Sequence, residues 1–345
     1  MKKTAKELKE EVSPEGKIIA LQKELAASES ELKNLKGRVS SSELFVDRII
    51  QAVVASKPYP KVRISTSKTK PIVSAIVKFS DWQIGEVINA KETEGFGNFD
   101  FDIAQKRIFR ITSSIIKWVK TMRTGYRIND LHIFGEGDWI SGDIHDELRI
   151  TNEFPLPVQT AKAGNLLGEV MLMLAPHFEN VIMWQVAADN HGRLVKKVQH
   201  KQRAINNMSY LVYAIANAKT ERCNNITIKD SLGIKTIAVV ENHKFLITHG
   251  NDVKSWMGIP YYGLSRGIGR EAKKRMKKKM GMFDLLSIGH WHVPSVVEDM
   301  IFVNGCLTGT TEFDHSQGRH AEPSQCAMLI SKKHGYFNWT AFRGE

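Results

Sequence analysis

The sequence predicts an α/β domain with a second, more antiparallel sheet, preceded by a helical N-terminal segment. Strands and helices alternate from Ile72 to about residue 220, and short strands predominate beyond that point. The first 56 residues repeat apolar side chains at helical spacing. Alternating strands and helices are typical of α/β domains, and a later run of strands indicates an added sheet. With 345 residues, the chain is long enough for one large domain and an extension.

Residues 1–56 are expected to form a helical, coiled-coil-like segment. Over 18–39 the apolar residues recur at alternating spacings of three and four, flanked by Glu and Lys, which is a heptad pattern. The stretch Ser40-Ser41-Ser42-Glu43 resembles a capping box that opens a second helix. The heptad predicts a homo-oligomer formed through this segment; the alternative is one amphipathic helix lying on the main domain. Residues 57–71, rich in proline and lysine, are expected to be a linker.

Residues 72–345 are expected to form the main domain. Strands at Ile72–Phe79, around Leu131 and at 181–186 alternate with helices at 103–123, 158–175 and 198–219. The later strands are predicted at 226–229, 235–240, 244–248, 284–288, 296–303, 326–331 and 336–342, with a basic segment at 264–280 between them.

Composition narrows the class of protein. The net charge of +12 and the pI of about 9.4 favour a polyanionic partner, although simple solubility would explain the same surplus. No apolar run is long enough to span a membrane, and the lysine-rich N-terminus lacks the apolar core of a secretory signal. The three cysteines show no paired spacing, which favours reduced thiols and a cytoplasmic location.

Five apolar strands are each followed by a side chain that can bind a metal ion. These side chains are Asp81 and Gln83, Asp138, Asn190 with His191, His249, and His290 with His292. Five such strand ends can converge on one edge of a sheet, and the Asp138 carboxylate has two oxygens with which to bridge two cations. Mixed nitrogen and oxygen donors without thiolate suit manganese, with magnesium, iron or zinc as alternatives. Two cations sharing a carboxylate are a common arrangement for hydrolysing phosphate esters.

This set of motifs resembles the calcineurin-like metallophosphoesterase superfamily, with its DxH, GDxxD, GNH(D/E), later histidine and GHxH motifs, over residues 72 to about 310. A DNA-repair exonuclease-like branch is one candidate within it. The resemblance implies a four-layer αββα sandwich with two divalent metal ions at one edge. It implies that one metal is held by Asp81, Gln83, Asp138 and His292. It implies that the other is held by Asp138, Asn190, His249 and His290, and that His191 is the general acid.

The sequence departs from the family pattern at three places. Gln83 stands where the family has histidine, and an amide oxygen is the weaker ligand. The GDxxD motif ends in Ser141, so Ser141 or Asp143 would have to orient His191. In the GNH motif, aspartate replaces the glycine and glycine replaces the trailing acid. Changes around a site more often tune it than abolish it.

The expected reaction is hydrolysis of a phosphate ester by a metal-bridging hydroxide, with His191 protonating the departing oxygen. Arg193 is a candidate for holding the phosphate, and a surface arginine is the equally weighted alternative. Nucleic acid is the favoured substrate because of a dense basic run and the preceding aromatic residues Trp256, Tyr261 and Tyr262. The candidate nucleic-acid-binding residues are Arg266, Arg270, Lys273, Lys274, Lys277 and Lys278. The alternatives are a solvated helix face, a phosphomonoesterase, and a non-catalytic metal-binding scaffold with a degraded site.

Overall fold

The computed structural model describes residues 21–30, 46–62, 69–229, 232–254 and 261–345. The chain divides into two units, Met1–Ala52 and Val53–Glu345. In the first unit, 21–30 and 46–52 are helical. Most of the 18–39 heptad and the capping pattern at 40–43 lie outside the described residues, so the coiled coil and the homo-oligomer remain predictions. None of the described helices is long and apolar enough to cross a membrane.

The second unit contains a six-stranded sheet in the order β11-β10-β1-β2-β3-β4. The central strands β1 (Ile72–Phe79), β2 (Arg127–Gly135), β3 (Asn180–Gln185) and β4 (Ile226–Lys229) are parallel. The antiparallel strands β10 (Ser324–Ser331) and β11 (Gly335–Arg343) complete one edge. Seven of the eight β1 residues are buried, as expected for a strand covered on both faces.

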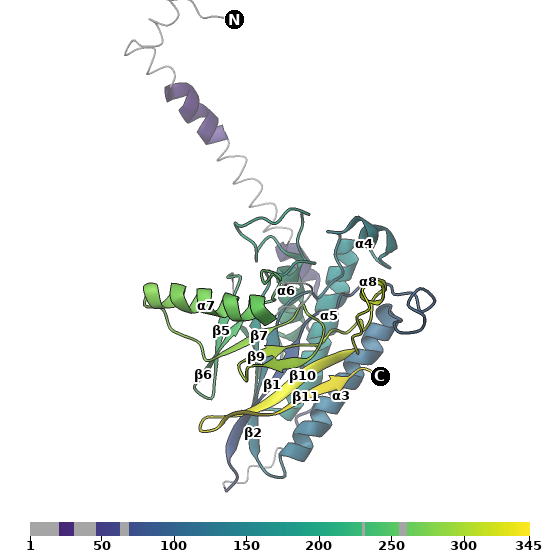
Figure 1. Ribbon diagram of the computed structural model, residues 1–345, viewed down its shortest axis with the longest axis vertical. Coiled ribbons are helices and arrows are strands. Elements are labelled where there is room, and N and C mark those ends of the chain that lie inside the picture. Colours follow the sequence, from purple (N-terminus) through teal and green to yellow (C-terminus); the bar gives the residue numbers. More distant parts are fainter. Residues whose placement is uncertain (1–20, 31–45, 63–68, 230–231, 255–260) are drawn as a thin grey trace, which may run out of the picture. The chain divides into compact units, whose positions relative to one another are not determined.

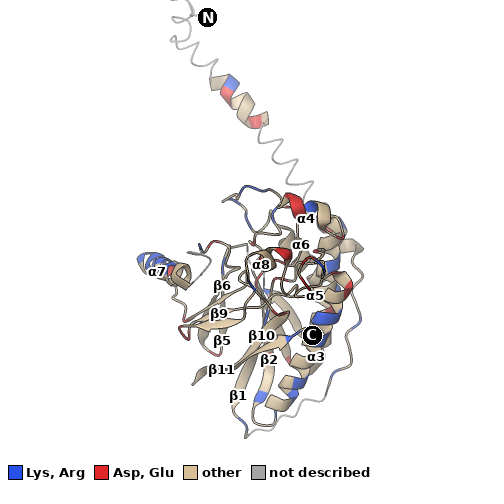
Figure 2. Cartoon of the chain, turned by 45° about the vertical axis from the view of Figure 1, so that its right-hand side comes forward, with Lys and Arg blue, Asp and Glu red and all other residues tan. Residues whose placement is uncertain are grey.

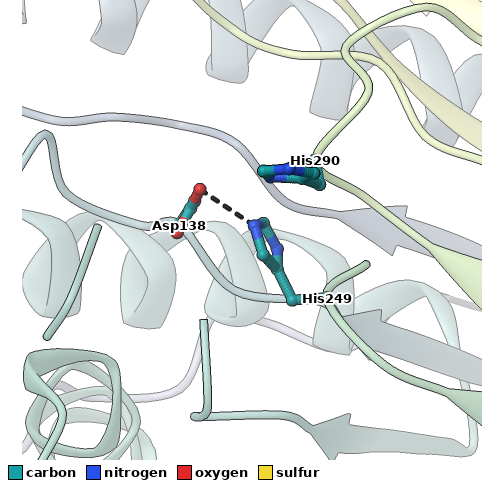
Figure 3. A group of neighbouring side chains, drawn as sticks. All are labelled: Asp138, His249 and His290. Carbon is teal, nitrogen blue, oxygen red and sulfur yellow. Dashed lines mark ion pairs between the residues drawn. The ribbon is translucent and has the colours of Figure 1, made fainter. Parts of the chain in front are cut away.

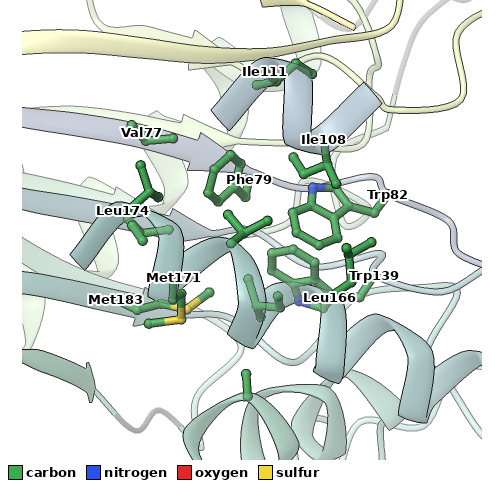
Figure 4. Close-up of a cluster of buried hydrophobic side chains, with 14 of the residues drawn as sticks. Val77, Phe79, Trp82, Ile108, Ile111, Trp139, Leu166, Met171, Leu174 and Met183 are labelled. Carbon is green, nitrogen blue, oxygen red and sulfur yellow. The ribbon is translucent and has the colours of Figure 1, made fainter. Parts of the chain in front are cut away.

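Three helices cover one face of this sheet: α3 (Phe101–Met122), α5 (Leu156–Leu174) and α6 (Met208–Thr220). Asp100 caps α3, because its side chain accepts a hydrogen bond from the Ile103 amide. The apolar faces of the helices pack on β1, β2 and β3 in the largest core of the molecule (Figure 4). Two tryptophans, Trp82 and Trp139, meet edge to face in this core with centroids 4.8 Å apart. Both belong to the loops that carry predicted metal ligands, so the core anchors the site.

The second sheet has the strand order β5-β6-β7-β9-β8, with two antiparallel and two parallel strand pairs. Its strands are β5 (Thr236–Val240), β6 (His243–Ile247), β7 (Leu285–Ile288), β8 (Ser295–Val297) and β9 (Ile301–Val303). One face packs on the first sheet around Phe134, Phe245 and Phe302. The other face packs on α7 (Tyr261–Lys277) through Leu264. Helices, sheet, sheet and helix form four successive layers, so the predicted αββα fold is confirmed (Figure 1).

Several predicted elements differ in detail. The helix predicted over 198–219 begins only at Met208, because the Asn207 side chain accepts the Ser209 amide and caps it there. The strand predicted over 296–303 is a hairpin, β8 and β9. The short helices α4 (Asp146–Thr151), α8 (Glu312–Ser316) and the 3-10 turn η1 (Ala175–His177) were not predicted. Val62, in the described part of the expected linker, donates its amide hydrogen to the Pro176 carbonyl oxygen of η1 at 3.0 Å.

Candidate metal centre

The predicted ligands gather where the parallel strands of both sheets end. Asp81 follows β1, Asp138 follows β2, His249 follows β6, and the two histidines of the GHxH motif follow β7. Main-chain hydrogen bonds fix these loops to one another. The Asp81 amide donates to the Gly137 carbonyl at 3.0 Å, and the His290 amide donates to the Asp81 carboxylate at 3.0 and 3.1 Å. The loops therefore form one joined rim.

Asp138 lies at the centre of the more closely packed half of the rim. Its Oδ2 is 2.9 Å from His249 Nε2, and the same ring nitrogen is 2.9 Å from Asn190 Oδ1. Ligand atoms of Asp138, His249 and His290 all lie within 4.8 Å of one another. Figure 3 shows these three side chains turned toward one another. Asp138 and His249 are fully buried or nearly so. We call Asp138, Asn190, His249 and His290 the Asp138 half.

The other predicted ligands, Asp81, Gln83 and His292, form the Asp81 half. His292 Nε2 lies 3.4 Å from Asp81 Oδ1. The Gln83 amide donates to the Asp138 carbonyl at 3.1 Å, so its loop is fixed to the Asp138 half. The Gln83 side-chain oxygen is buried and has no hydrogen-bond partner among the described residues. A buried acceptor of this kind is unfavourable unless something binds it.

Five predicted ligands have a backbone conformation that residues other than glycine rarely adopt. Their φ angles are 55° at Asp81, 46° at Gln83, 52° at Asp138, 69° at His290 and 59° at His292. Each such residue costs roughly 1–3 kcal/mol, and such strain concentrates at functional sites. The fold thus maintains an unfavourable backbone in order to turn these side chains toward one another.

The pKa values of these groups follow from burial and from their neighbours. Burial and the adjacent His249 lower the pKa of His290 to about 3, which keeps this imidazole in the neutral form that binds metals. Burial alone would lower the pKa of His249, but the Asp138 charge and hydrogen bond raise it to about 10. The Asp138 pKa is held far below its usual range despite burial, chiefly by His249 and His191.

The donor set fits divalent cations. It offers carboxylate, amide and imidazole groups, and no cysteine is among them. The buried Gln83 oxygen points to the same conclusion, because a cation would satisfy it. Both halves could therefore hold a metal ion, with Asp138 between them. A cation on the Asp138 half would compete with the proton that His249 shares with Asp138.

His191 lies beside Asp138 but is not one of the predicted metal ligands. Its Nε2 is 4.0 Å from Asp138 Oδ2, and its amide donates to Asp138 Oδ1 at 3.0 Å. Its Nδ1 is 2.6 Å from the Ser141 carbonyl oxygen, which fixes the ring and places a proton on Nδ1. Because the main chain makes this contact, serine can occupy a position where the family has aspartate. Arg193 is held by a hydrogen bond from its Nε to the Asn190 carbonyl at 3.1 Å.

The altered GNH motif is accounted for by Asp189, which the sequence prediction did not include among the site residues. Its carboxylate accepts the Asp138 amide at 2.8 Å, the Gly192 amide at 2.9 Å and the Asn207 side chain at 3.0 Å. A Cβ on Gly192 would lie 2.0 Å from Asn207 Oδ1, so a larger residue there would displace the Asn207 side chain that caps α6. Asp189 and Gly192 are thus matched to each other, and Asp189 holds the loop of the central ligand.

Three further buried charged groups near the site were also missed. Lys78 and Glu136 form an ion pair at 3.5 Å, and the Lys78 ammonium also donates to main-chain carbonyls of β7 and β9, which connects the two sheets beneath the rim. Burial raises the pKa of Glu86 to about 7, although His191 and His292 oppose the change. The sequence signal for this buried ion pair was Lys78 itself, a lysine near the end of a mostly apolar strand.

The six candidate nucleic-acid-binding residues lie on α7 or directly after it, and all six are exposed. Figure 2 shows how lysine and arginine predominate on α7. Glu271 is buried beneath them and pairs with Arg275 at 3.0 Å and Lys235 at 2.9 Å. Tyr261 and Tyr262 are exposed at the start of the helix, and Trp256 lies outside the described residues. The helix thus presents a basic face to solvent while its buried face carries the compensating acid.

No protein-family model matches the chain, and no curated protein matches its sequence. Among solved structures, it is similar to zinc-complexed Vps29 from Entamoeba histolytica, at 11% identity over 78% of this chain and 99% of that one, with a TM-score of 0.31. It is also similar to vacuolar protein sorting 29 from Cryptosporidium parvum, at 13% identity over 79% of this chain and 99% of that one, with a TM-score of 0.29. A third similar structure is a predicted phosphoesterase from Streptococcus pneumoniae, at 10% identity over 52% of this chain and 90% of that one, with a TM-score of 0.25. Similarities this low say nothing about activity.

Proposed function

We propose that this protein is a metal-dependent phosphoesterase and that its substrate is a phosphodiester of nucleic acid. The observation that carries the first part is the Asp138 half, where carboxylate, amide and imidazole donors from separate strands meet in a buried rim. The strained φ angles support it, because packing alone would not require them at five ligand positions.

The residues of both halves would hold two divalent cations, with Asp138 shared between them. When bound, such cations neutralise phosphate charge and lower the pKa of the attacking water. The chain itself supplies the rest. The strained loops fix the donors in advance, and Asp189 and Glu136 hold the Asp138 and His249 loops through hydrogen bonds at 2.8 Å.

We assign His191 the role of general acid. The Ser141 carbonyl holds Nδ1, so Nε2 is the nitrogen that can give a proton to the departing oxygen. During hydrolysis the attacking water would lose one proton to solvent as its oxygen bonds to phosphorus. The bond from phosphorus to the leaving oxygen would break, and that oxygen would take the Nε2 proton, which His191 would regain from solvent. Arg193, held by its Nε to the Asn190 carbonyl, would bind a phosphate oxygen by charge-assisted hydrogen bonds.

Charge supports nucleic acid over a small phosphomonoester. The α7 face offers six exposed cations, and Tyr261 and Tyr262 are exposed beside them. An ion pair between Arg203 and Asp252, at 2.9 Å, connects the loop after His191 with the segment that leads to α7. Basic side chains therefore lie on both sides of this connection, which suits a chain of phosphates.

The activity is tested with chelator-treated protein to which Mn, Mg, Zn or Fe is returned. We expect bis(p-nitrophenyl) phosphate to be hydrolysed only after a cation is restored, and faster than p-nitrophenyl phosphate. Faster cleavage of the monoester would favour the phosphomonoesterase. Bound metal without hydrolysis of any ester would favour the non-catalytic scaffold.

Nucleic-acid binding by α7 is tested by replacing Lys273, Lys274, Lys277 and Lys278 with alanine. The log of affinity should fall by roughly 0.7–0.9 per log unit of salt for each phosphate contacted, and the variant should show a flatter slope. Replacing four exposed cations of α3 (Lys106, Arg110, Lys117 and Lys120) removes the same charge elsewhere and serves as the control. Equal salt slopes in both variants would mean that the α7 cations form only a solvated helix face.

A further inference from the structure

A basic hollow of about 220 Å³ is lined by Asp189 and by residues of the loop that follows His191. Its lining includes three cations, Arg193, Lys201 and Arg203, together with the polar side chains of Asp189, Gln199 and Asn206. The single acid among them has its oxygens occupied by the amides of Asp138 and Gly192 and by the side chains of Asn207 and Ser209. The hollow therefore presents net positive charge and hydrogen-bond donors.

Arg203 gives the hollow the character of a built site. Its side chain is only 10% exposed, and its Nη1 lies 2.9 and 3.1 Å from the two Asp252 oxygens, which fixes the guanidinium plane. Its Nη2 is buried and has no hydrogen-bond partner among the described residues. A buried charged donor without an acceptor is unfavourable. The Arg203 guanidinium therefore keeps one donor, Nη2, that Asp252 does not use.

The position of the hollow relative to His191 indicates which part of a substrate would enter it. Asp189 lines the hollow and also holds the Asp138 loop, so the two sites share a wall. Arg193 lines it as well and follows the proposed general acid by two residues. Because His191 is assigned to protonate the departing oxygen, the hollow lies on the side of the leaving group.

We propose that this hollow binds a second phosphate of the substrate, carried by the departing nucleoside. This inference rests on the proposed function and makes it narrower: the preferred substrate has a phosphate on each side of one nucleoside, as in an oligonucleotide. The guanidinium of Arg203 and the ammonium of Lys201 would donate to the phosphate oxygens in charge-assisted hydrogen bonds. A substrate with a single phosphate would leave those donors unused.

The test compares turnover of the thymidine dinucleotide TpT with its 5′-phosphorylated and 3′-phosphorylated forms. Product analysis identifies the departing nucleoside, and the form that carries the extra phosphate on that nucleoside should give the higher kcat/KM, by about 10- to 100-fold. Arg203→Gln and Lys201→Gln should each reduce this preference. Lys197→Gln, which removes an exposed cation of the same loop that does not line the hollow, should leave it unchanged. Equal kcat/KM for all three dinucleotides in the parent protein would overturn the proposal.

Binding to chelator-treated protein separates this proposal from the proposed activity. Isothermal titration should show tighter binding of the preferred phosphorylated dinucleotide than of TpT, with the difference reduced in Arg203→Gln. This result in a protein that hydrolyses nothing would sustain the phosphate site and refute the phosphoesterase. Hydrolysis without any such difference in binding or turnover would sustain the phosphoesterase and refute the second phosphate site. If Arg203→Gln fails to fold by circular dichroism, the exposed Lys201→Gln carries the same comparison.

Discussion

The two halves of the candidate metal centre differ in how completely the protein prepares them. In the Asp138 half, carboxylate, amide and imidazole already meet at 2.9 Å. In the Asp81 half, His292 Nε2 lies 3.4 Å from Asp81 Oδ1, and the Gln83 side-chain oxygen has no partner among the described residues. A neutral amide oxygen is also a weaker ligand than imidazole. If the proposed function holds, this difference predicts that the Asp138 half holds its cation tightly and that the Asp81 half exchanges its cation readily.

The largest effect that leaves both halves in place is expected from His191→Ala. His191 adjoins the Asp138 half but is assigned as acid and not as ligand, so metal content should stay nearly unchanged. Turnover of a diester with a poor leaving group should fall roughly 100- to 10,000-fold, and turnover of an activated aryl ester should fall less. Metal analysis and steady-state kinetics on the two esters measure this. Loss of metal together with activity would make His191 a ligand.

That the candidate ligands meet at one rim could be predicted because each follows an apolar run typical of a buried strand. The role of Asp189 could not, because aspartate in place of glycine looked like the loss of a motif. Its meaning depends on Asn207 and Ser209, which belong to the cap and first turn of α6. That helix was itself predicted to begin too early, since nothing in its apolar spacing marks Asn207 as the cap.

Contacts between distant segments were the other limit. Arg203 and Asp252 are 49 positions apart, and neither has a local pattern that indicates the other. The same holds for Lys78 and Glu136, whose pairing depends on how β1 and β2 lie side by side. Charged side chains could be assigned to strand ends and helix faces from spacing alone, but their partners required the assembled sheets.

A moderate effect is expected from Gln83→His, which makes the two halves more alike. An imidazole in place of the amide should strengthen the Asp81 half, so the Mn concentration for half-maximal activity should fall about tenfold. Gln83→Ala is the matched control and should raise that concentration. Titration of the chelator-treated proteins with Mn measures both. Identical Mn curves for parent, Gln83→His and Gln83→Ala would show that this position holds no metal.

The smallest effect on activity, none at neutral pH, is expected at His132 in β2, the strand that carries Asp138. Burial lowers the pKa of His132 to about 4, below its usual 6.5, so the folded state resists protonation. The contribution of neutral His132 to the free energy of unfolding is therefore fully present above pH 6.5. It is lost as the pH falls toward 4, and the loss is about 2 to 3 kcal/mol at pH 4.5. His132→Gln should remove this loss, as urea unfolding at pH 7.5 and 4.5 would show. An unchanged pH dependence would contradict the assignment.

The most direct test of the metal centre is Asp138→Asn, measured as metal content per chain and as turnover of bis(p-nitrophenyl) phosphate in the same preparations. Asp138 is the carboxylate proposed to bind both cations, so the variant should lose bound metal and roughly 1,000-fold or more in turnover while keeping its circular dichroism spectrum. Asp146→Asn, at an exposed acid that pairs with Lys196, should match the parent in both measurements. Full metal content and full turnover in Asp138→Asn would contradict a centre organised by this carboxylate.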